Sequence, residues 1–276
     1  GANGADMTTA SLGYIDWYTQ AQMNGVTAVT SIAMNIHTAN GVHHTNAAGN
    51  ESNDTNPGPS HLVAPADAFK CITLGAVSSS GAIASFSSDG PTADGRVKPE
   101  LLARGVTTYT VSPSSTTSTT TADGTSLSTP LAACAVACLI QARPWWTVDQ
   151  MRAHLFATAD YAAAHNGAFD PLYVRGYGII NAYAAYNTCD HAGIITLDQA
   201  KYPCGAVATI AVSDCGLDQN HGAIETVQVT IASTSEPVGE TITLTELGPD
   251  AAYFEGTIPL ALADAPGTLW ITAGDT

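Results

Sequence analysis

Two patterns of apolar and polar residues divide the sequence. From residue 8 to about residue 187, short apolar runs alternate with segments whose apolar residues recur every three or four positions, such as Val29, Ile32, Ala33 and Ile36. From Ala192 onward, short runs with strand-like alternation are separated by turn signals. The first pattern predicts an α/β domain with a mostly parallel sheet and helices on both faces, and the second predicts an all-β sandwich. We place the domains at residues 1–187 and 188–276.

The individual elements follow from the same pattern. A strand is predicted over residues 8–13, then a helix ending near Asn40-Gly41 and a buried strand leading into Ala47. Further along, the sequence predicts an exposed hairpin or loop through Ser112–Thr121 and a helix opened by a capping box at Thr147. In the second domain the expected strands are residues 194–197, 206–212, 227–232, 241–247, 252–260 and 269–272.

Charge and composition narrow the functional classes. Eight Lys and Arg residues against 24 Asp and Glu residues give a net charge of −16, which argues against nucleic acid and anionic membranes as partners. The sequence predicts no membrane span. The low charged fraction of 12% is typical of a secreted or cell-surface protein. The sequence opens at Gly1 without a signal peptide, which indicates a processed chain or a fragment.

The stretch from Gly124 to Pro130, Gly-Thr-Ser-Leu-Ser-Thr-Pro, runs into a nearly uninterrupted apolar segment that ends at Ile140. Glycine permits a tight turn and proline is tolerated in the first turn of a helix, so Ser126 is expected at a helix N-terminus. There its hydroxyl lies beside backbone N–H groups that stabilise an oxyanion. The apolar composition predicts that this helix is buried on every side.

Further motifs stand around this serine in a fixed order: Ser11-Leu12-Gly13, Ala47-Ala48-Gly49-Asn50, the run 86–92, Lys98-Pro99-Glu100-Leu101 and the run 176–181. Together they resemble the subtilisin-like (S8) serine proteases. The resemblance implies a subtilisin-like sheet, with Ser126 as nucleophile, Asn50 as oxyanion donor and Ser11, Leu12 and Gly13 as the substrate-binding strand. It also implies peptide-bond hydrolysis through an acyl-enzyme, with protein or peptide substrates.

The family's catalytic Asp and His have no counterpart in this sequence. Asp89-Gly90, Asp94-Gly95 and Asp123-Gly124 are loop turns without a preceding apolar strand, and none of the eight histidines precedes Gly-Thr. A serine hydroxyl is a poor nucleophile until a base accepts its proton. The α/β domain is therefore incomplete at its N-terminus. An N-terminal segment or a second chain is expected to carry the missing Asp and His, and the chain alone is expected to be inactive.

Three functional hypotheses stay open at this point. The chain is the C-terminal portion of a working protease, or a degenerate relative that serves as a scaffold, filament or surface-layer subunit. In the third hypothesis, the main function of the chain is binding by the sandwich domain. Arg104, where the family usually has proline, and the adjacent His43 and His44 in a buried strand favour the second hypothesis.

The sequence predicts no metal and no cofactor, and it does not identify ligands for a structural calcium ion. His43 and His44 are neighbours on a strand and point to opposite faces, so they cannot share one ion without a bend; local hydrogen bonds are expected to satisfy them. Cys71, Cys134 and Cys138 are expected to be buried core residues. A disulfide is expected within the trio Cys189, Cys204 and Cys215.

Overall fold

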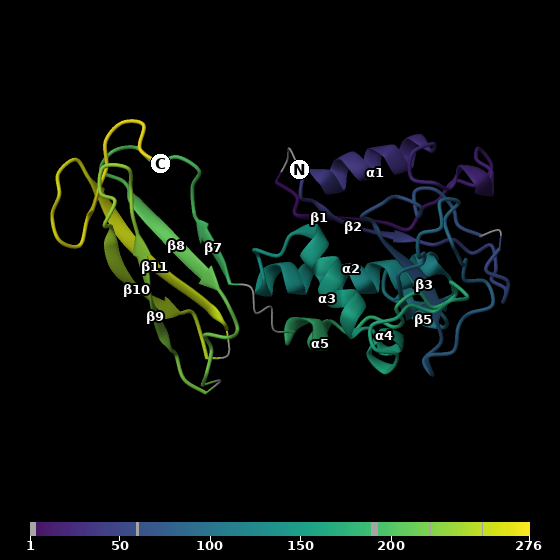
Figure 1. Cartoon of the computed structure of the whole chain (residues 1–276). Coiled ribbons are helices and arrows are strands. Elements are labelled where there is room, and N and C mark those ends of the chain that lie inside the picture. The colour runs from purple at the N-terminus through teal and green to yellow at the C-terminus, as the bar shows by residue number, and fades with distance from the viewer. Residues whose placement is uncertain (1–3, 59–60, 189–192, 221, 250) are drawn as a thin grey trace. The chain divides into compact units, whose positions relative to one another are not determined.

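The computed structural model of the chain describes residues 4–58, 61–188, 193–220, 222–249 and 251–276 (Figure 1). The chain divides into two compact units, Gly1–Thr188 (unit 1) and Cys189–Thr276 (unit 2). This division lies one residue from the boundary given by the sequence pattern.

Unit 1 is built on a parallel sheet in the order β1-β2-β3-β4, formed by Met7–Ala10, His43–Ala47, Ile72–Val77 and Leu101–Arg104. Strands β2 and β3 are buried along their whole length, whereas β1 is half-buried. Figure 1 shows α1 (Val29–Ala39) on one face of the sheet and α2 (Thr125–Ala142) and α3 (Val148–Thr158) on the other. Unit 1 therefore has the predicted α/β architecture, although the first strand ends at Ala10 and leaves Ser11–Gly13 as an extended connection.

The remaining helices of unit 1 are short, namely a 3₁₀ turn (Gln20–Gln22), α4 (Asp160–Ala164) and α5 (Ala182–Tyr186). Helix α3 begins with the predicted capping box, in which the side chains of Thr147 and Gln150 each bond the other's backbone N–H. Helix α1 ends with Asn40 as its cap, followed by Gly41 at φ 81°. These two helix ends are positioned by local sequence alone.

Helix α2 is not buried on every side, contrary to the prediction. Seven of its residues are buried, but Leu131, Cys134 and Cys138 form an exposed stripe. By length and composition alone this helix is apolar enough to cross a membrane. Because it packs against all four strands of the sheet, its inward face belongs to the core of unit 1.

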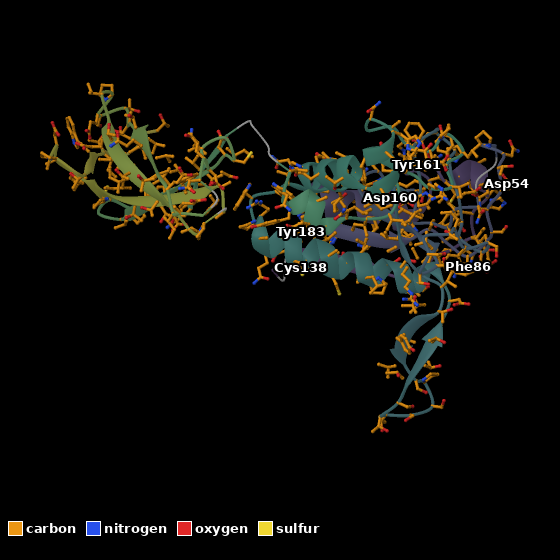
Figure 2. All side chains as sticks on the ribbon, turned by 90° about the horizontal axis from the view of Figure 1, so that it is seen from below. Asp54, Phe86, Cys138, Asp160, Tyr161 and Tyr183 are labelled. Carbon is orange, nitrogen blue, oxygen red and sulfur yellow. The ribbon has the colours of Figure 1, made fainter. Side chains whose placement is uncertain are left out.

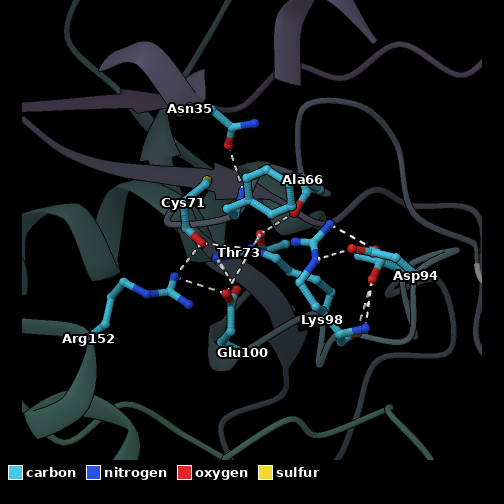
Figure 3. Close-up of polar contacts among 11 residues, drawn as sticks. Asn35, Ala66, Cys71, Thr73, Asp94, Lys98, Glu100 and Arg152 are labelled. Carbon is cyan, nitrogen blue, oxygen red and sulfur yellow. Dashed lines mark hydrogen bonds and ion pairs between the residues drawn. The ribbon is translucent and has the colours of Figure 1, made fainter. Parts of the chain in front are cut away.

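A buried ionic cluster joins the strands to α3 (Figure 3). Lys98 is 1% exposed, and its ammonium donates to the Cys71 carbonyl at 2.7 Å, to Thr73 Oγ1 at 3.0 Å and lies 2.7 Å from Glu100 Oε1. Arg152 of α3 donates to the same Cys71 carbonyl and to Glu100. Burial lowers the pKa of Lys98, against the opposing effect of the Glu100 charge. Lys98 and Glu100 of the Lys-Pro-Glu motif are both shielded from water, and each charge has a partner of opposite charge in this cluster.

The two histidines of β2 point to opposite faces, as expected, but local hydrogen bonds do not satisfy them fully. His44 Nδ1 bonds Thr8 Oγ1 at 2.7 Å, and the same hydroxyl bonds His37 Nε2 at 2.8 Å. Within the described residues, His43 Nδ1 and His44 Nε2 are buried without a hydrogen-bond partner. Burial lowers the pKa of both imidazoles, which favours their neutral forms.

A two-stranded hairpin, β5 (Thr108–Val111) and β6 (Thr119–Ala122), projects from unit 1 and ends two residues before Gly124 (Figure 2). The Ser- and Thr-rich run 112–121, predicted to be an exposed hairpin or loop, forms its tip and most of β6. Its apolar side chains at Tyr109 and Val111 are exposed, so the hairpin contributes little to the core.

Unit 2 is all β, with strands within one to two residues of those predicted. They are β7 (Ile194–Leu197), β8 (Val207–Ser213), β9 (Thr226–Ile231), β10 (Glu240–Glu246), β11 (Tyr253–Ala261) and β12 (Leu269–Trp270). The described strands form one sheet in the order β7-β8-β11-β10-β9, with β12 paired in parallel to β11. They do not include the second facing sheet that a sandwich requires.

The cysteines differ in part from the prediction. Cys71 is a buried free thiol, as expected, but Cys134 and Cys138 are exposed free thiols on α2 and not core residues. In unit 2, Cys204 is free and exposed. Cys189 lies outside the described residues, so a bridge within the trio of Cys189, Cys204 and Cys215 stays a prediction.

His44 gives unit 1 a predicted acid sensitivity. Burial, with a smaller contribution from the nearby His37 and Lys98 charges, lowers the pKa of His44 to about 4. An unfolded histidine binds a proton near pH 6.5, so protonation favours the unfolded chain: the stabilisation is complete above pH 6.5 and is lost as the pH falls toward 4. The loss amounts to about 3 kcal/mol. Urea titrations at pH 7 and pH 4 measure the free energy of unfolding at each pH. The difference between the two values should be smaller for His44→Val than for the unmodified chain.

The exposed His165 provides a matched control. In His165→Gln, the free energy of unfolding should differ between pH 7 and pH 4 by as much as in the unmodified chain. An unchanged difference in His44→Val contradicts the assignment of acid sensitivity to His44.

Candidate active site

The first turn of α2 is fixed by two glycines and a serine. Gly124, the residue before the helix, has φ 149° and ψ 152°, a conformation that favours glycine. Its N–H donates to the Gly105 carbonyl at 2.8 Å, and a Cβ on Gly105 would collide with Ser128. Ser128 Oγ donates to the Ala103 carbonyl at 3.0 Å, which ties the helix start to the end of β4.

Asn50 is oriented by Thr125. Asn50 Oδ1 accepts hydrogen bonds from the Thr125 backbone N–H at 2.9 Å and from Thr125 Oγ1 at 3.0 Å. Because a backbone N–H only donates, the amide oxygen must face Thr125, and the Nδ2 amino group points away. Asn50 is exposed, and no hydrogen bond of Nδ2 is found within the described residues. The amide is therefore presented as a donor beside the start of α2.

Ser126 and Ser11 hold each other by two hydrogen bonds. Ser11 Oγ donates to the Ser126 carbonyl at 2.9 Å, and Ser126 Oγ donates to the Ser11 carbonyl at 3.3 Å. Pro130 is the sixth residue of α2, not a first-turn residue as the sequence suggested. Because proline lacks the N–H that would reach the carbonyl four residues earlier, the Ser126 carbonyl has no helical donor. Ser11 supplies the donor that Pro130 removes.

The backbone N–H of Ser126 lies in the first turn of α2, where N–H groups have no partner within the helix. Together with Asn50 Nδ2 it provides two donors at the positive end of the helix dipole. A Cβ built on Gly124 would lie 3.6 Å from both of these nitrogens, and the Ser126 hydroxyl is half-buried. This arrangement can stabilise negative charge that develops on a carbonyl attacked by Ser126.

The Ser11–Gly13 segment borders the serine. Leu12 is 67% exposed, and a Cβ on Gly13 would collide with Val63. The Tyr14 and Ala64 backbones then exchange two hydrogen bonds of 2.8 and 3.1 Å. Glycine at position 13 thus permits the close approach of the two backbones, while Leu12 stays open to solvent.

Sequence analysis missed a histidine–carboxylate pair. His61 Nδ1 bonds Asp89 Oδ1 at 2.6 Å, and Asp89 is 1% exposed. The two residues lie in turn-rich segments 28 positions apart, so no local signal identifies them. Within the described residues the hydroxyl of Ser126 bonds the Ser11 carbonyl and no imidazole. The structure therefore brings together Ser11, Asn50 and Ser126, but it does not place His61 as their base.

One group of carboxylates is close enough to hold a metal ion in the part of the chain that the structure describes. Single oxygens of Asp218, Glu225 and Glu246 lie within 4.8 Å of one another. Both oxygens of Glu246 accept backbone N–H groups, from Glu225, Ala251 and Ala252. The group belongs to unit 2 and has no part in the serine site.

A parallel α/β sheet with a serine in the first turn of a central helix, flanked by an asparagine amide, defines a subtilisin-like serine protease fold. The model of the Subtilase family matches residues 2–179 of the chain. The chain belongs to the subtilase family. It is 36% identical over 140 residues to subtilisin amylosacchariticus of Bacillus subtilis subsp. amylosacchariticus, covering 50% of this chain and 32% of that protein. With subtilisin BL of Lederbergia lenta it is 34% identical, covering 55% and 49%.

Solved structures show the same fold. The self-cleaved protease domain of PatA aligns with a TM-score of 0.51 and 24% identity, covering 67% of this chain and 62% of that one. The prenylagaramide maturation protease PagA aligns with a TM-score of 0.51 and 21% identity over the same shares. The matches to subtilisin amylosacchariticus and subtilisin BL cover about a third and about half of the length of those two proteins, respectively.

Because Ser11 supplies the hydrogen bond that Pro130 removes, we predict that substitutions of these two residues have coupled effects on stability. Ser11→Ala leaves the Ser126 carbonyl without a donor and should cost about 1 kcal/mol of unfolding free energy. Pro130→Ala restores a backbone N–H to the helix, so it should be about 1 kcal/mol more favourable in the Ser11→Ala chain than in the unmodified chain. Urea unfolding of the four chains measures this coupling.

Ser112→Ala, in the exposed hairpin tip, is the matched control and should show no coupling to Pro130→Ala. Additive effects of Ser11→Ala and Pro130→Ala would show that Ser11 does not replace the missing helical donor.

Proposed function

We propose that this chain supplies the nucleophile and oxyanion donors of a serine endopeptidase, with the catalytic Asp and His contributed by an N-terminal segment or a second chain. The observation that carries the proposal is the orientation of Asn50: the Thr125 N–H binds its oxygen and turns its amino group outward. A scaffold without catalysis has no need of this orientation.

In the proposed reaction, the base accepts the proton of Ser126 Oγ as the oxygen attacks a peptide carbonyl. Asn50 Nδ2 and the Ser126 N–H bind the resulting oxyanion, and the amine leaves to give an acyl-enzyme that water hydrolyses. In the chain alone, Ser126 Oγ donates to the Ser11 carbonyl, which cannot accept a proton covalently. The nucleophile therefore stays protonated until a base replaces this partner.

The substrates are proteins or peptides in an extended conformation. Ser11–Gly13 is an extended segment beside Ser126, and it follows β1 without belonging to a strand. Its backbone can pair with a substrate backbone, and the exposed Leu12 contacts a substrate side chain. Subtilisin relatives and the net charge of −16 support a secreted or cell-surface protein, with unit 2 as an accessory binding module.

Arg104, which favoured an inactive scaffold at the level of sequence, keeps the loop before the active serine ordered. Its guanidinium donates to the carbonyls of Val106 at 3.3 Å and Thr107 at 2.9 Å. The Thr107 N–H in turn donates to Asp123 Oδ1 at 2.6 Å, directly before Gly124. Replacement of the family's usual proline by arginine is therefore compatible with the catalytic geometry.

The isolated chain should react poorly with a fluorophosphonate probe and should hydrolyse no casein, because no base activates Ser126. Active-site labelling followed by mass spectrometry of the Ser126 peptide measures the reaction, with a complete subtilisin as positive control. Rapid stoichiometric labelling of Ser126 in the isolated chain would sink the missing-base hypothesis.

In the complete protein, Asn50→Ala should lower kcat with little change in KM, because the oxyanion needs the donor more than the ground-state carbonyl does. Loss of such a donor in subtilisin itself costs about 3 kcal/mol, and we expect a similar effect. Asn56→Ala, at an exposed residue of the following loop, changes neither Asn50 nor Ser126 and is the control. If the unmodified complete protein cleaves no unfolded protein, the scaffold hypothesis replaces the protease; if Ser126→Ala retains the activity of the unmodified complete protein, Ser126 is not the nucleophile.

A further inference from the structure

A cavity of about 300 Å³ lies at the amino ends of β3 and β4. Its wall combines aromatic rings with basic side chains, namely Phe69, Phe156, Phe169, Tyr177, Arg96 and Arg152. The serine site lies at the carboxyl end of β4, where the Gly124 N–H bonds the Gly105 carbonyl. The two sites are therefore at opposite ends of the sheet. A cavity of this volume accommodates a small ligand.

The aromatic rings of the cavity pack against one another and against a guanidinium group. The rings of Phe156 and Tyr177 stack with their centroids 4.6 Å apart, and Phe169 meets Tyr177 edge-on at 6.2 Å. The Arg152 guanidinium lies 4.8 Å from the centroid of the Phe156 ring. Phe169 is 36% exposed, so part of this apolar surface is open to a ligand. Such a surface is suited to a flat aromatic group.

The buried ionic cluster beside the cavity contains one more positive charge than negative. Lys98 and Arg152 both pair with Glu100, at 2.7 and 3.0 Å. Figure 3 shows Arg152 reaching Glu100 from α3. The other arginine of the wall, Arg96, pairs through two hydrogen bonds with Asp94. Among the described residues no second carboxylate pairs with Lys98 or Arg152, so one positive charge of the cluster lacks a counter-charge.

Arg152 also retains hydrogen-bond donors for a ligand. Its hydrogen bonds to the Cys71 carbonyl and to Glu100 both come from Nη1. Within the described part of the chain, its Nε and Nη2 make no hydrogen bond. A guanidinium presents these two N–H groups side by side, in a geometry that matches the two oxygens of a carboxylate. The Arg152 side chain is 16% exposed and lines the cavity.

We propose that this cavity binds a carboxylate attached to an aromatic group, as in a phenylalkanoic acid or a peptide that ends in phenylalanine. The carboxylate pairs with Nε and Nη2 of Arg152 and supplies the negative charge that the cluster lacks. The aromatic group lies on the surface formed by Phe156, Phe169 and Tyr177. The inference goes beyond the proposed function, because this site is remote from Ser126 and requires no catalysis.

Calorimetric titration of residues 1–276 at pH 7 tests the site with three probes. 3-Phenylpropanoate should bind at least about tenfold more tightly than 3-phenylpropanamide, because only the acid forms charge-assisted hydrogen bonds with Arg152. Inorganic phosphate carries the charge without the ring and should also bind at least about tenfold more weakly than the acid. No binding of the acid, or equal affinity of the acid and the amide, overturns the proposal. Equal affinity of phosphate and the acid reveals a general anion site and overturns it as well.

Two variants locate the bound acid. Arg152→Gln should weaken the binding of 3-phenylpropanoate at least about tenfold, whereas Arg104→Gln, which removes the same charge at the other end of β4, should not weaken it. Phe169→Ser should weaken binding about threefold or more, whereas Tyr109→Ser, at an exposed aromatic residue of the hairpin, should not. Phe169→Ser leaves the ionic cluster in place and decides the outcome if Arg152→Gln does not fold. Unchanged affinity in Phe169→Ser, or in a folded Arg152→Gln, overturns the site.

A competition experiment identifies the source of the carboxylate. The peptide Ala-Ala-Phe with a free C-terminus and the same peptide with an amidated C-terminus are each added to the complex with 3-phenylpropanoate. Displacement by the free peptide alone supports a site for peptide C-termini, and displacement by neither supports a site for small aromatic acids. Equal displacement by the two peptides contradicts the requirement for a carboxylate and overturns the proposal.

Discussion

The hydrogen bond from the Thr125 N–H to Asn50 Oδ1 is the interaction on which the serine site depends. It joins the loop after β2 to the first turn of α2, two elements that are far apart in the sequence. An amide has one accepting and one donating end, so fixing the oxygen also fixes the direction of the amino group. Gly49 at φ 122° and Gly124 at φ 149° allow the two backbones to reach this geometry. The donor is therefore preorganised before any substrate arrives.

Pro130 links this geometry to the start of the sheet. A helical N–H at this position would satisfy the Ser126 carbonyl and leave Ser11 without a role. With proline there, the carbonyl accepts from Ser11 Oγ, so the segment after β1 is held against the nucleophile. The helical hydrogen bond that Pro130 removes is thus replaced by a contact that holds the Ser11–Gly13 segment beside Ser126.

The sequence was sufficient for features that depend on neighbouring residues. Periodicity located the strands of unit 2, and local capping and turn residues located the capping box at Thr147 and a helix start near Ser126. It could not show which side of α1 or α2 is covered, because periodicity identifies a stripe and not its partner. The Ser11–Ser126 and His61–Asp89 contacts also escaped it, since residues 115 and 28 positions apart meet only through the fold.

The two donors proposed for an oxyanion come from the loop after β2 and from the start of α2. At the far edge of the sheet, β4 is covered by hydrogen bonds between Leu102 and the backbones of Gly178 and Ile180. The proton of Ser126, by contrast, is directed at the carbonyl of Ser11, the residue that follows β1. A base that takes this proton has to displace that carbonyl as the hydrogen-bond partner.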